Sequence, residues 1–127
     1  MGKHEEHDAL AERMFGAIMA GDIDTVLACY SDDAVMRINV APGDMGPADI
    51  AGMVQMVSEK IPDFTYSDIR RVTTDDGFVE QHLVTGTGLT GQPFSFEVCA
   101  VAKVVDGRVA VLEEYADSAA MAPMGLF

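Results

Sequence analysis

The apolar residues of this chain change their spacing at Pro62, and this change constrains the fold more than any other feature. Before Pro62, apolar side chains recur about every 3.6 residues, as on one face of a helix. After Pro62 they alternate with polar residues, as in β-strands. Helices gathered early and strands gathered late predict an α+β fold, with helices packed on one face of a curled sheet.

Turn residues divide these two halves into elements. Gly21 is placed to end the first helix, Pro47 suits the first turn of the third helix, and Pro62 forbids its continuation. The expected helices cover residues 4–20 and 47–60, with a short helix between them that is capped by Asp22 or Asp24 and ends near residue 30. A short strand covers 34–39. Four further strands are expected at 64–74, 78–89, 93–105 and 108–117, joined by the glycine-bearing turns 75–77, 90–92 and 106–107. The segment 31–33, which contains Asp32 and Asp33, is expected to end the second helix.

Length and charge exclude several classes of protein. The 127 residues fit a single domain, 1–127, that is long enough to bury a core. The 21 acidic residues against 8 basic ones give a net charge of -13, which would repel nucleic acid and anionic membrane surfaces. No apolar stretch is long enough to span a bilayer, and the polar N-terminus does not resemble a secretory signal, so we expect a cytoplasmic protein. Cys29 and Cys99 lie in apolar contexts and are expected to be buried, reduced thiols.

Several short phrases resemble the nuclear transport factor 2-like superfamily, which includes ketosteroid isomerase, limonene-epoxide hydrolase and the SnoaL-type polyketide cyclases. They lie at residues 20–24, 30–34, 106–109 and 113–117, and the last is similar to the hydrolase's Trp-Arg-Asp-Tyr-Phe-Asp segment. The resemblance covers nearly the whole chain. It implies a cystatin-like cone, with three N-terminal helices on a curved, mainly antiparallel sheet that encloses an apolar pocket. It also implies a homodimer formed through the outer sheet face, where Val101 and similar apolar residues are expected.

The catalytic residues of ketosteroid isomerase are not found at the matching positions. Its base falls on Ile38 or Asn39, and its oxyanion-stabilising pair falls on Met14 and on Cys99 or Ala100. None of these side chains can act as that base or form that pair. The usual ketosteroid isomerase mechanism is therefore not expected.

The hydrolase relay is matched at one position only. Its second Asp falls on Glu114, a conservative exchange, whereas its Arg falls on Gln81 and its first Asp on Leu83. The Tyr and Asn that hold its water fall near Met36 and Ile38. The SnoaL-type cyclases use a single acidic acid/base, with which one pocket carboxylate is compatible.

Strand alternation, together with the match to the hydrolase's second Asp, makes Glu114 the candidate catalytic residue. Leu112 and Glu114 share one face of the last strand, so Glu114 is expected to face apolar neighbours that raise its pKa. The alternative is a carboxylate half-solvated at the strand end or paired with an arginine. In the strand at 78–89, Gln81 is expected to face inward and to form one hydrogen bond with a ligand. His82 is then expected to face outward, although a slip of one residue would bring it into the pocket.

An apolar pocket is expected around these groups. The residues expected to line it are Met14, Phe15, Ile18, Met36, Ile38, Phe96, Val98 and Leu112. Nine methionines suit an adaptable pocket, although ordinary core filling explains most of them equally well. The apolar tail, residues 121–127, is expected either to fold over the pocket mouth or to pack on a partner subunit.

No metal or cofactor site is indicated. His4 and His7 have a spacing that can hold a metal, but they lie at a chain end that is prone to fray, and no third ligand is near. The chain has no glycine-rich phosphate loop. The leading hypothesis is an isomerase, cyclase or hydrolase that acts on a small apolar molecule with Glu114 as acid/base. The alternative is a non-catalytic domain that binds such a molecule or serves dimerisation.

Overall fold

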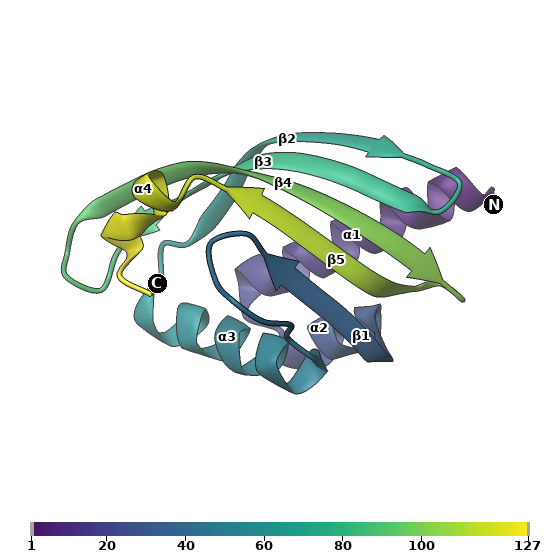
Figure 1. Ribbon diagram of the computed structural model, residues 1–127, viewed down its shortest axis with the longest axis horizontal. Helices are drawn as coiled ribbons and strands as arrows, with labels where there is room; N and C mark the ends of the chain where they lie inside the picture. The colour runs from purple at the N-terminus through teal and green to yellow at the C-terminus, as the bar shows by residue number, and fades with distance from the viewer. Residues whose placement is uncertain (1, 127) are drawn as a thin grey trace.

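The computed structural model describes residues 2–126, in which helices lie against one face of a curved five-stranded sheet (Figure 1). The helices are α1 (Lys3–Ala20), α2 (Ile23–Cys29), α3 (Pro47–Lys60) and α4 (Ser118–Met121), followed by a short 3-10 helix, η1 (Ala122–Met124). The strands are β1 (Tyr30–Ile38), β2 (Thr65–Thr73), β3 (Gly77–Thr87), β4 (Pro93–Val105) and β5 (Arg108–Ala116). This architecture confirms the α+β fold expected from the change of period at Pro62.

The helix ends follow the chemistry of their terminal residues. Gly21 ends α1 in the left-handed conformation, with φ of 70°, and its N–H donates to the Ile18 carbonyl. The Asp22 carboxylate accepts the Thr25 N–H and so caps α2. Pro47 occupies the first turn of α3, and the Asp49 carboxylate accepts the Gly46 N–H.

The sheet order is β1-β5-β4-β3-β2, so the first strand pairs with the last. β1 and β5 run parallel, and the other three pairs are antiparallel. This pairing sets Ile38 opposite Glu114, and the antiparallel β4–β5 pair sets Ala100 opposite the same residue. Glu114 therefore lies in a strand with a neighbour on each side.

The first strand begins earlier than expected. The segment at 31–33 was expected to separate α2 from a strand starting at residue 34, but β1 starts at Tyr30, which pairs with Val109. Asp32 and Asp33 are exposed and belong to the strand. A register irregularity follows Tyr30, and β1 is an edge strand, where charged side chains face solvent without disturbing a second neighbour.

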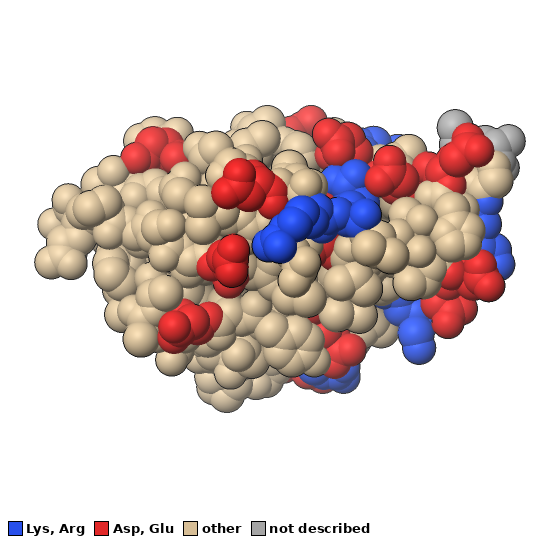
Figure 2. Space-filling view, turned by 90° about the horizontal axis from the view of Figure 1, so that it is seen from above, with Lys and Arg blue, Asp and Glu red and all other residues tan. Residues whose placement is uncertain are grey.

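The core lies between the helices and the sheet in two clusters. The first is built around Met14, Val26 and Leu112, and the second around Val57, Phe94 and Met121. The opposite face of the sheet carries acidic and basic side chains among uncharged ones (Figure 2). Cys29 is buried and Cys99 is half-buried, and both are free thiols. Within residues 2–126, no helix is long and apolar enough to cross a membrane.

Candidate functional site

A cavity of about 80 Å³ lies where the two core clusters meet, between α3, the inner face of the sheet and the C-terminal segment. Most of its lining is apolar. The apolar lining residues are Ile18, Met36, Ile38, Ile50, Met53, Val54, Val57, Phe64, Val84, Phe96, Val98, Met121, Met124 and Leu126. The remaining lining residues are Glu114, His82, Tyr30 and Tyr66. A small number of polar groups in an apolar concavity is the usual composition of a small-molecule site.

Glu114 faces this cavity from β5, as the alternation of the strand predicts. Leu112, two residues earlier on the same face, is fully buried, while Glu114 is half-buried and lines the cavity. Burial raises the pKa of the Glu114 carboxyl to about 7, the His82 ring opposes this rise, and Glu80 adds to it. Among the described residues, no side chain or backbone group forms a hydrogen bond with the Glu114 carboxyl. The group is therefore available to a ligand.

His82 lies on the same cavity from β3 and is held by a buried carboxylate. The side chain is 1% exposed, and its Nδ1 lies 2.6 Å from Oε2 of the fully buried Glu80. Arg71 donates to Oε1 of the same carboxylate at 2.7 Å. The rings of Tyr66 and Phe15 pack on the imidazole, with centroids 4.3 Å and 5.0 Å away. The Nε2 atom of His82 is buried without a hydrogen-bond partner among the described residues.

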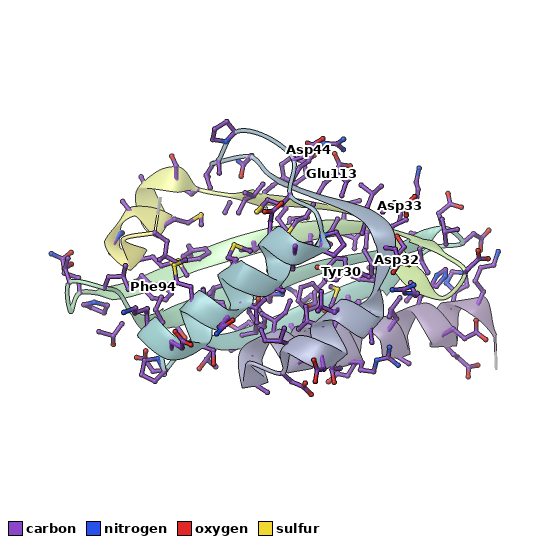
Figure 3. The ribbon with its side chains drawn as sticks, turned by 90° about the horizontal axis from the view of Figure 1, so that it is seen from below. Tyr30, Asp32, Asp33, Asp44, Phe94 and Glu113 are labelled. Carbon is purple, nitrogen blue, oxygen red and sulfur yellow. The ribbon has the colours of Figure 1, made fainter. Side chains whose placement is uncertain are left out.

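Tyr30 adds a third unpartnered polar group. The residue is 1% exposed and lies on the helix-covered side of the sheet (Figure 3). Its hydroxyl has no hydrogen-bond partner among residues 2–126, and burial raises the pKa of that hydroxyl well above its usual value. A buried polar atom without a partner costs about 1–3 kcal/mol, so the two such atoms at this cavity, on His82 and Tyr30, need an explanation. A bound molecule or water that satisfies them supplies one.

The expected lining residues fall into two groups. Ile18, Met36, Ile38, Phe96 and Val98 line the cavity together with Glu114. Met14, Phe15 and Leu112 are buried in the first core cluster and do not reach the cavity. Sequence reasoning also missed lining residues. The expected inward face of α3 already contained Ile50, Met53, Val54 and Val57, and strand alternation from Val84 could have found His82.

The expected orientation of Gln81 and His82 is wrong by one residue. Gln81 is exposed in an open depression on the outer sheet face, beside Cys99 and Tyr115, while His82 faces the cavity. Both faces of β3 carry apolar residues, so alternation alone does not decide which face points inward. The face that contains His82 also contains Glu80, so turning it inward buries a charged side chain. This burial is possible because Arg71 lies directly opposite Glu80 in β2 and neutralises the charge of its carboxylate.

The C-terminal segment covers the cavity, which is the first of the two arrangements expected for it. Met121 and Met124 are buried and line the cavity beside Leu126, while Phe127 lies outside the described residues. Asp117 caps α4 by accepting the Ala119 N–H. The segment is fastened to the β3–β4 connection by the Leu89 N–H, which donates to the Met124 carbonyl.

The two N-terminal histidines hold the β2–β3 connection. His4 lies 2.8 Å from the Thr73 hydroxyl and 3.0 Å from Asp75, and His7 lies 2.9 Å from the Thr74 carbonyl. Within residues 2–126 there is no group of three His, Cys, Asp or Glu side chains that could hold a metal. These histidines therefore have a structural explanation in the described part of the chain.

A model of the SnoaL-like domain matches residues 11–112 of this chain. The chain belongs to the SnoaL-like family. No curated protein sequence matches it.

Solved structures of the same fold include a candidate polyketide cyclase from Xanthomonas campestris pv. campestris. It is 22% identical to this chain, with a TM-score of 0.81 over 91% of this chain and 93% of that one. An LEH-like epoxide hydrolase of M. tuberculosis is 24% identical, with a TM-score of 0.80 over 94% and 89% of the two chains. A candidate isomerase from Bacillus subtilis is 16% identical, with a TM-score of 0.82 over 98% and 96%. At these identities the likeness shows the fold alone.

The buried carboxyl of this SnoaL-like domain predicts a pH-dependent stability. The pKa of Glu114 is raised from 4.5 to about 7 in the folded chain, so the folded state binds the proton more tightly than the unfolded state. The resulting stability is fully present below about pH 4.5 and is lost as the pH rises through about 7. At about 1.4 kcal/mol per pKa unit, a rise in pKa from 4.5 to about 7 corresponds to a loss of about 3–4 kcal/mol.

Replacement of Glu114 by glutamine should remove this loss, because the amide does not ionise. We expect Glu114→Gln to be more stable than the native chain at pH 8 and about equal to it at pH 5, as measured by urea denaturation. Glu113→Gln, which alters the neighbouring residue, is the matched control, because Glu113 lies on the other face of β5. Parallel pH profiles for the native chain and Glu114→Gln would contradict a buried, proton-holding Glu114.

Proposed function

We propose that this SnoaL-like chain binds a small, largely apolar molecule in the cavity and that Glu114 transfers a proton to or from it. The observation that carries the proposal is a carboxyl without a hydrogen-bond partner among the described residues, in a cavity whose lining is mostly apolar. With its pKa near 7, Glu114 is present as both acid and carboxylate at neutral pH. A general acid or base works best under this condition.

The lining favours a neutral ligand. Fourteen of the eighteen lining residues are apolar, and no Lys or Arg is among them, so an anionic group would lose its hydration without gaining a counter-charge. The cavity volume of about 80 Å³ is small beside the roughly 150 Å³ of an apolar cavity that holds benzene. A larger ligand would require the flexible side chains of Met36, Met53, Met121 or Met124 to move.

The fold neighbours agree with this class of reaction. They include a candidate polyketide cyclase, an LEH-like epoxide hydrolase and a candidate isomerase. Among these, isomerisation and cyclisation need little more than a positioned acid/base. We therefore favour proton transfer of this kind for the present chain over epoxide opening.

A ligand screen followed by turnover measurements tests the proposal. The native chain, Glu114→Gln and the control Glu113→Gln are screened by thermal shift against small ketones, terpenoid epoxides and aromatic polyketides. A ligand at about 100 times its Kd should add about 2.7 kcal/mol to the stability. For the class that binds, we expect Glu114→Gln to keep the binding and to lower kcat by about 100-fold to 10,000-fold, the usual contribution of an acid/base.

The outcomes separate an enzyme from a binding protein. Turnover by the native chain that persists unchanged in Glu114→Gln would exclude Glu114 as the acid/base. Binding without turnover in any of the three proteins would support the non-catalytic alternative. If no compound binds, the cavity is not a ligand site, and the proposal fails.

A further inference from the structure

We infer that residues 118–126 of the C-terminal segment form a hinged gate, which opens at Asp117 to admit a small uncharged molecule to the cavity. The inference rests on the proposed function, because it gives the ligand of the cavity its route of entry. The cavity of about 80 Å³ leaves little free space for a ligand while this segment is packed over it.

The segment forms one wall of the cavity. Met121 and Met124 are each only 4% exposed, and they line the cavity together with Leu126. Both methionines belong to the same core cluster as Val57 of α3. In Figure 1, α4 and the C-terminus lie at the end of the sheet near which α3 ends. Movement of the segment away from the sheet would therefore open the cavity from this end.

The segment is held to the rest of the protein mainly by apolar contacts. Residues 118–126 contain no charged side chain. In the described part of the chain, one hydrogen bond joins them to another element, from the Leu89 N–H to the Met124 carbonyl at 3.1 Å. The remaining hydrogen bonds of the segment close within it or on Asp117. Local opening costs least where few hydrogen bonds and few buried contacts have to break.

The other walls of the cavity are held more firmly. The loop after β1 is fixed where Met36 and Met45 exchange two backbone hydrogen bonds of 2.9 Å. Helix α3 buries Ile50, Val54 and Val57 in the core. The sheet is joined by continuous strand pairing from β1 to β2. Residues 118–126 are consequently the wall that opens with the least disruption.

A clamp at the end of β5 places the hinge. The Asn39 side chain donates to the Ala116 carbonyl at 3.0 Å and accepts the Ala116 N–H at 2.9 Å. Ala116 is therefore fixed to the sheet. The next residue, Asp117, caps α4 by accepting the Ala119 N–H and so belongs to the moving part. Rotation of the backbone between Ala116 and Asp117 would carry the gate away as a unit.

Thiol labelling tests the passage of a small uncharged molecule. Val84 is 2% exposed and lines the cavity from β3, so Val84→Cys places a thiol inside it. Iodoacetamide, which is small and uncharged, should reach this thiol only when the gate opens. Adding Gly88→Ala, whose Cβ would overlap the Pro123 carbonyl oxygen, should speed the labelling by about 10-fold. Adding Gly52→Ala, whose Cβ meets no atom within 4 Å, should leave the rate unchanged.

The two native cysteines are internal references in the same mass spectra. Cys99 is half-buried in the outer depression of the sheet, away from the cavity, and it reports the activity of the reagent. Cys29 is buried in the first core cluster and does not line the cavity, so it reports global unfolding. Gly88→Ala should speed labelling of the Val84→Cys thiol and not of Cys29. Equal acceleration of both thiols would mean that the whole chain unfolds, and it would overturn the gate.

Methyl NMR measures the opening in the native chain without a ligand. We expect relaxation dispersion at the methyl groups of Met121 and Met124 and none at Met14, which is buried outside the cavity. A disulfide can hold the gate closed, because a Cβ at Gly125 would lie 3.4 Å from the Leu89 Cβ, close to the separation in a disulfide. The oxidised double variant Leu89→Cys with Gly125→Cys should lose the dispersion. The reduced form of the same protein should keep it, and it controls for the two substitutions.

Each outcome bears on the gate separately from the proposed function. Absence of dispersion at Met121 and Met124, or labelling of Val84→Cys that Gly88→Ala does not accelerate, would overturn the gate. If Val84→Cys does not fold, the dispersion of the native chain and its loss in the oxidised double variant decide the question. Neither measurement involves Glu114 or a bound compound. An opening gate over a cavity that binds nothing would therefore leave the gate standing and the proposed function overturned, and ligand binding without opening would do the reverse.

Discussion

Replacement of Arg71 by methionine is expected to lower the free energy of unfolding by about 3–5 kcal/mol, the usual effect of removing one partner from a buried ion pair. The Arg71 side chain is only 9% exposed, and the Glu80 carboxylate that it neutralises is fully buried. Methionine keeps much of the side-chain volume but leaves Glu80 without its positive partner. The change should appear as a lower midpoint of urea denaturation with an unchanged slope.

Two further variants make this result specific. Arg70→Met removes the adjacent arginine, whose side chain is 60% exposed and lies 3.6 Å from the exposed Glu97, so it should change stability by less than about 1 kcal/mol. The double variant Arg71→Met with Glu80→Gln should be more stable than Arg71→Met alone, because the unpaired charge is gone. If Arg71→Met has no greater effect than Arg70→Met, Glu80 is not an ionised, buried partner of Arg71.

Replacement of Gly88 by alanine should detach the C-terminal segment from the cavity. A Cβ at Gly88 would overlap the Pro123 carbonyl oxygen and lie 3.0 Å from the Met124 Cα, and both are backbone atoms that cannot move aside alone. Overpacking of this kind typically costs about 1–3 kcal/mol. Displacement of the segment would also uncover Met121 and Met124, each only 4% exposed in the native fold.

The detachment is measurable as faster proteolysis after β5 and as increased binding of a hydrophobic dye, with a lower denaturation midpoint. Gly52→Ala is the control, because Gly52 lies in α3 with no atom within 4 Å of the added Cβ. That control should be neutral or stabilising by up to about 1 kcal/mol, since alanine favours the helix. Equal proteolysis of the two variants would show that the segment does not depend on the close approach at Gly88.

The fold could be predicted from the sequence because its information is local. The change of period at Pro62, the left-handed cap at Gly21 and the glycine-bearing turns predict the three long helices and the five strands within a few residues, whereas α4 and η1 were not predicted. The start of β1 was the main error, because Asp32 and Asp33 have the composition of a helix end. An edge position tolerates these charges, but whether a strand lies at an edge is decided by its distant partner β5.

Part of the candidate site could also be predicted from local sequence information. Glu114 was found from its match to the hydrolase's second Asp and from the phase of its own strand, in which Leu112 marks the inner face. His82 was expected to face outward because Gln81 falls at the position of the hydrolase's Arg and was taken to face inward. The true inward face of β3 contains both His82 and Glu80, and burial of Glu80 requires a cation opposite it. That cation is Arg71, and its position depends on the β2–β3 pairing, whose register shifts between Ser67 and Arg70. Alternation along one strand contains no information about such a shift.

The parallel pairing of β1 with β5 has a consequence for the order in which the chain folds. Apart from a local bridge between Met36 and Met45, β1 pairs only with β5, so its place in the sheet cannot form until nearly the whole chain has been synthesised. Closing so long a loop is slow, and we expect docking of β1, with α2 and α3 on either side of it in sequence, to be a late folding event. The same event brings Ile38 opposite Glu114 and Tyr30 into the core. We therefore expect the cavity to be completed around Glu114 only at the end of folding, so partly folded chains should bind no ligand.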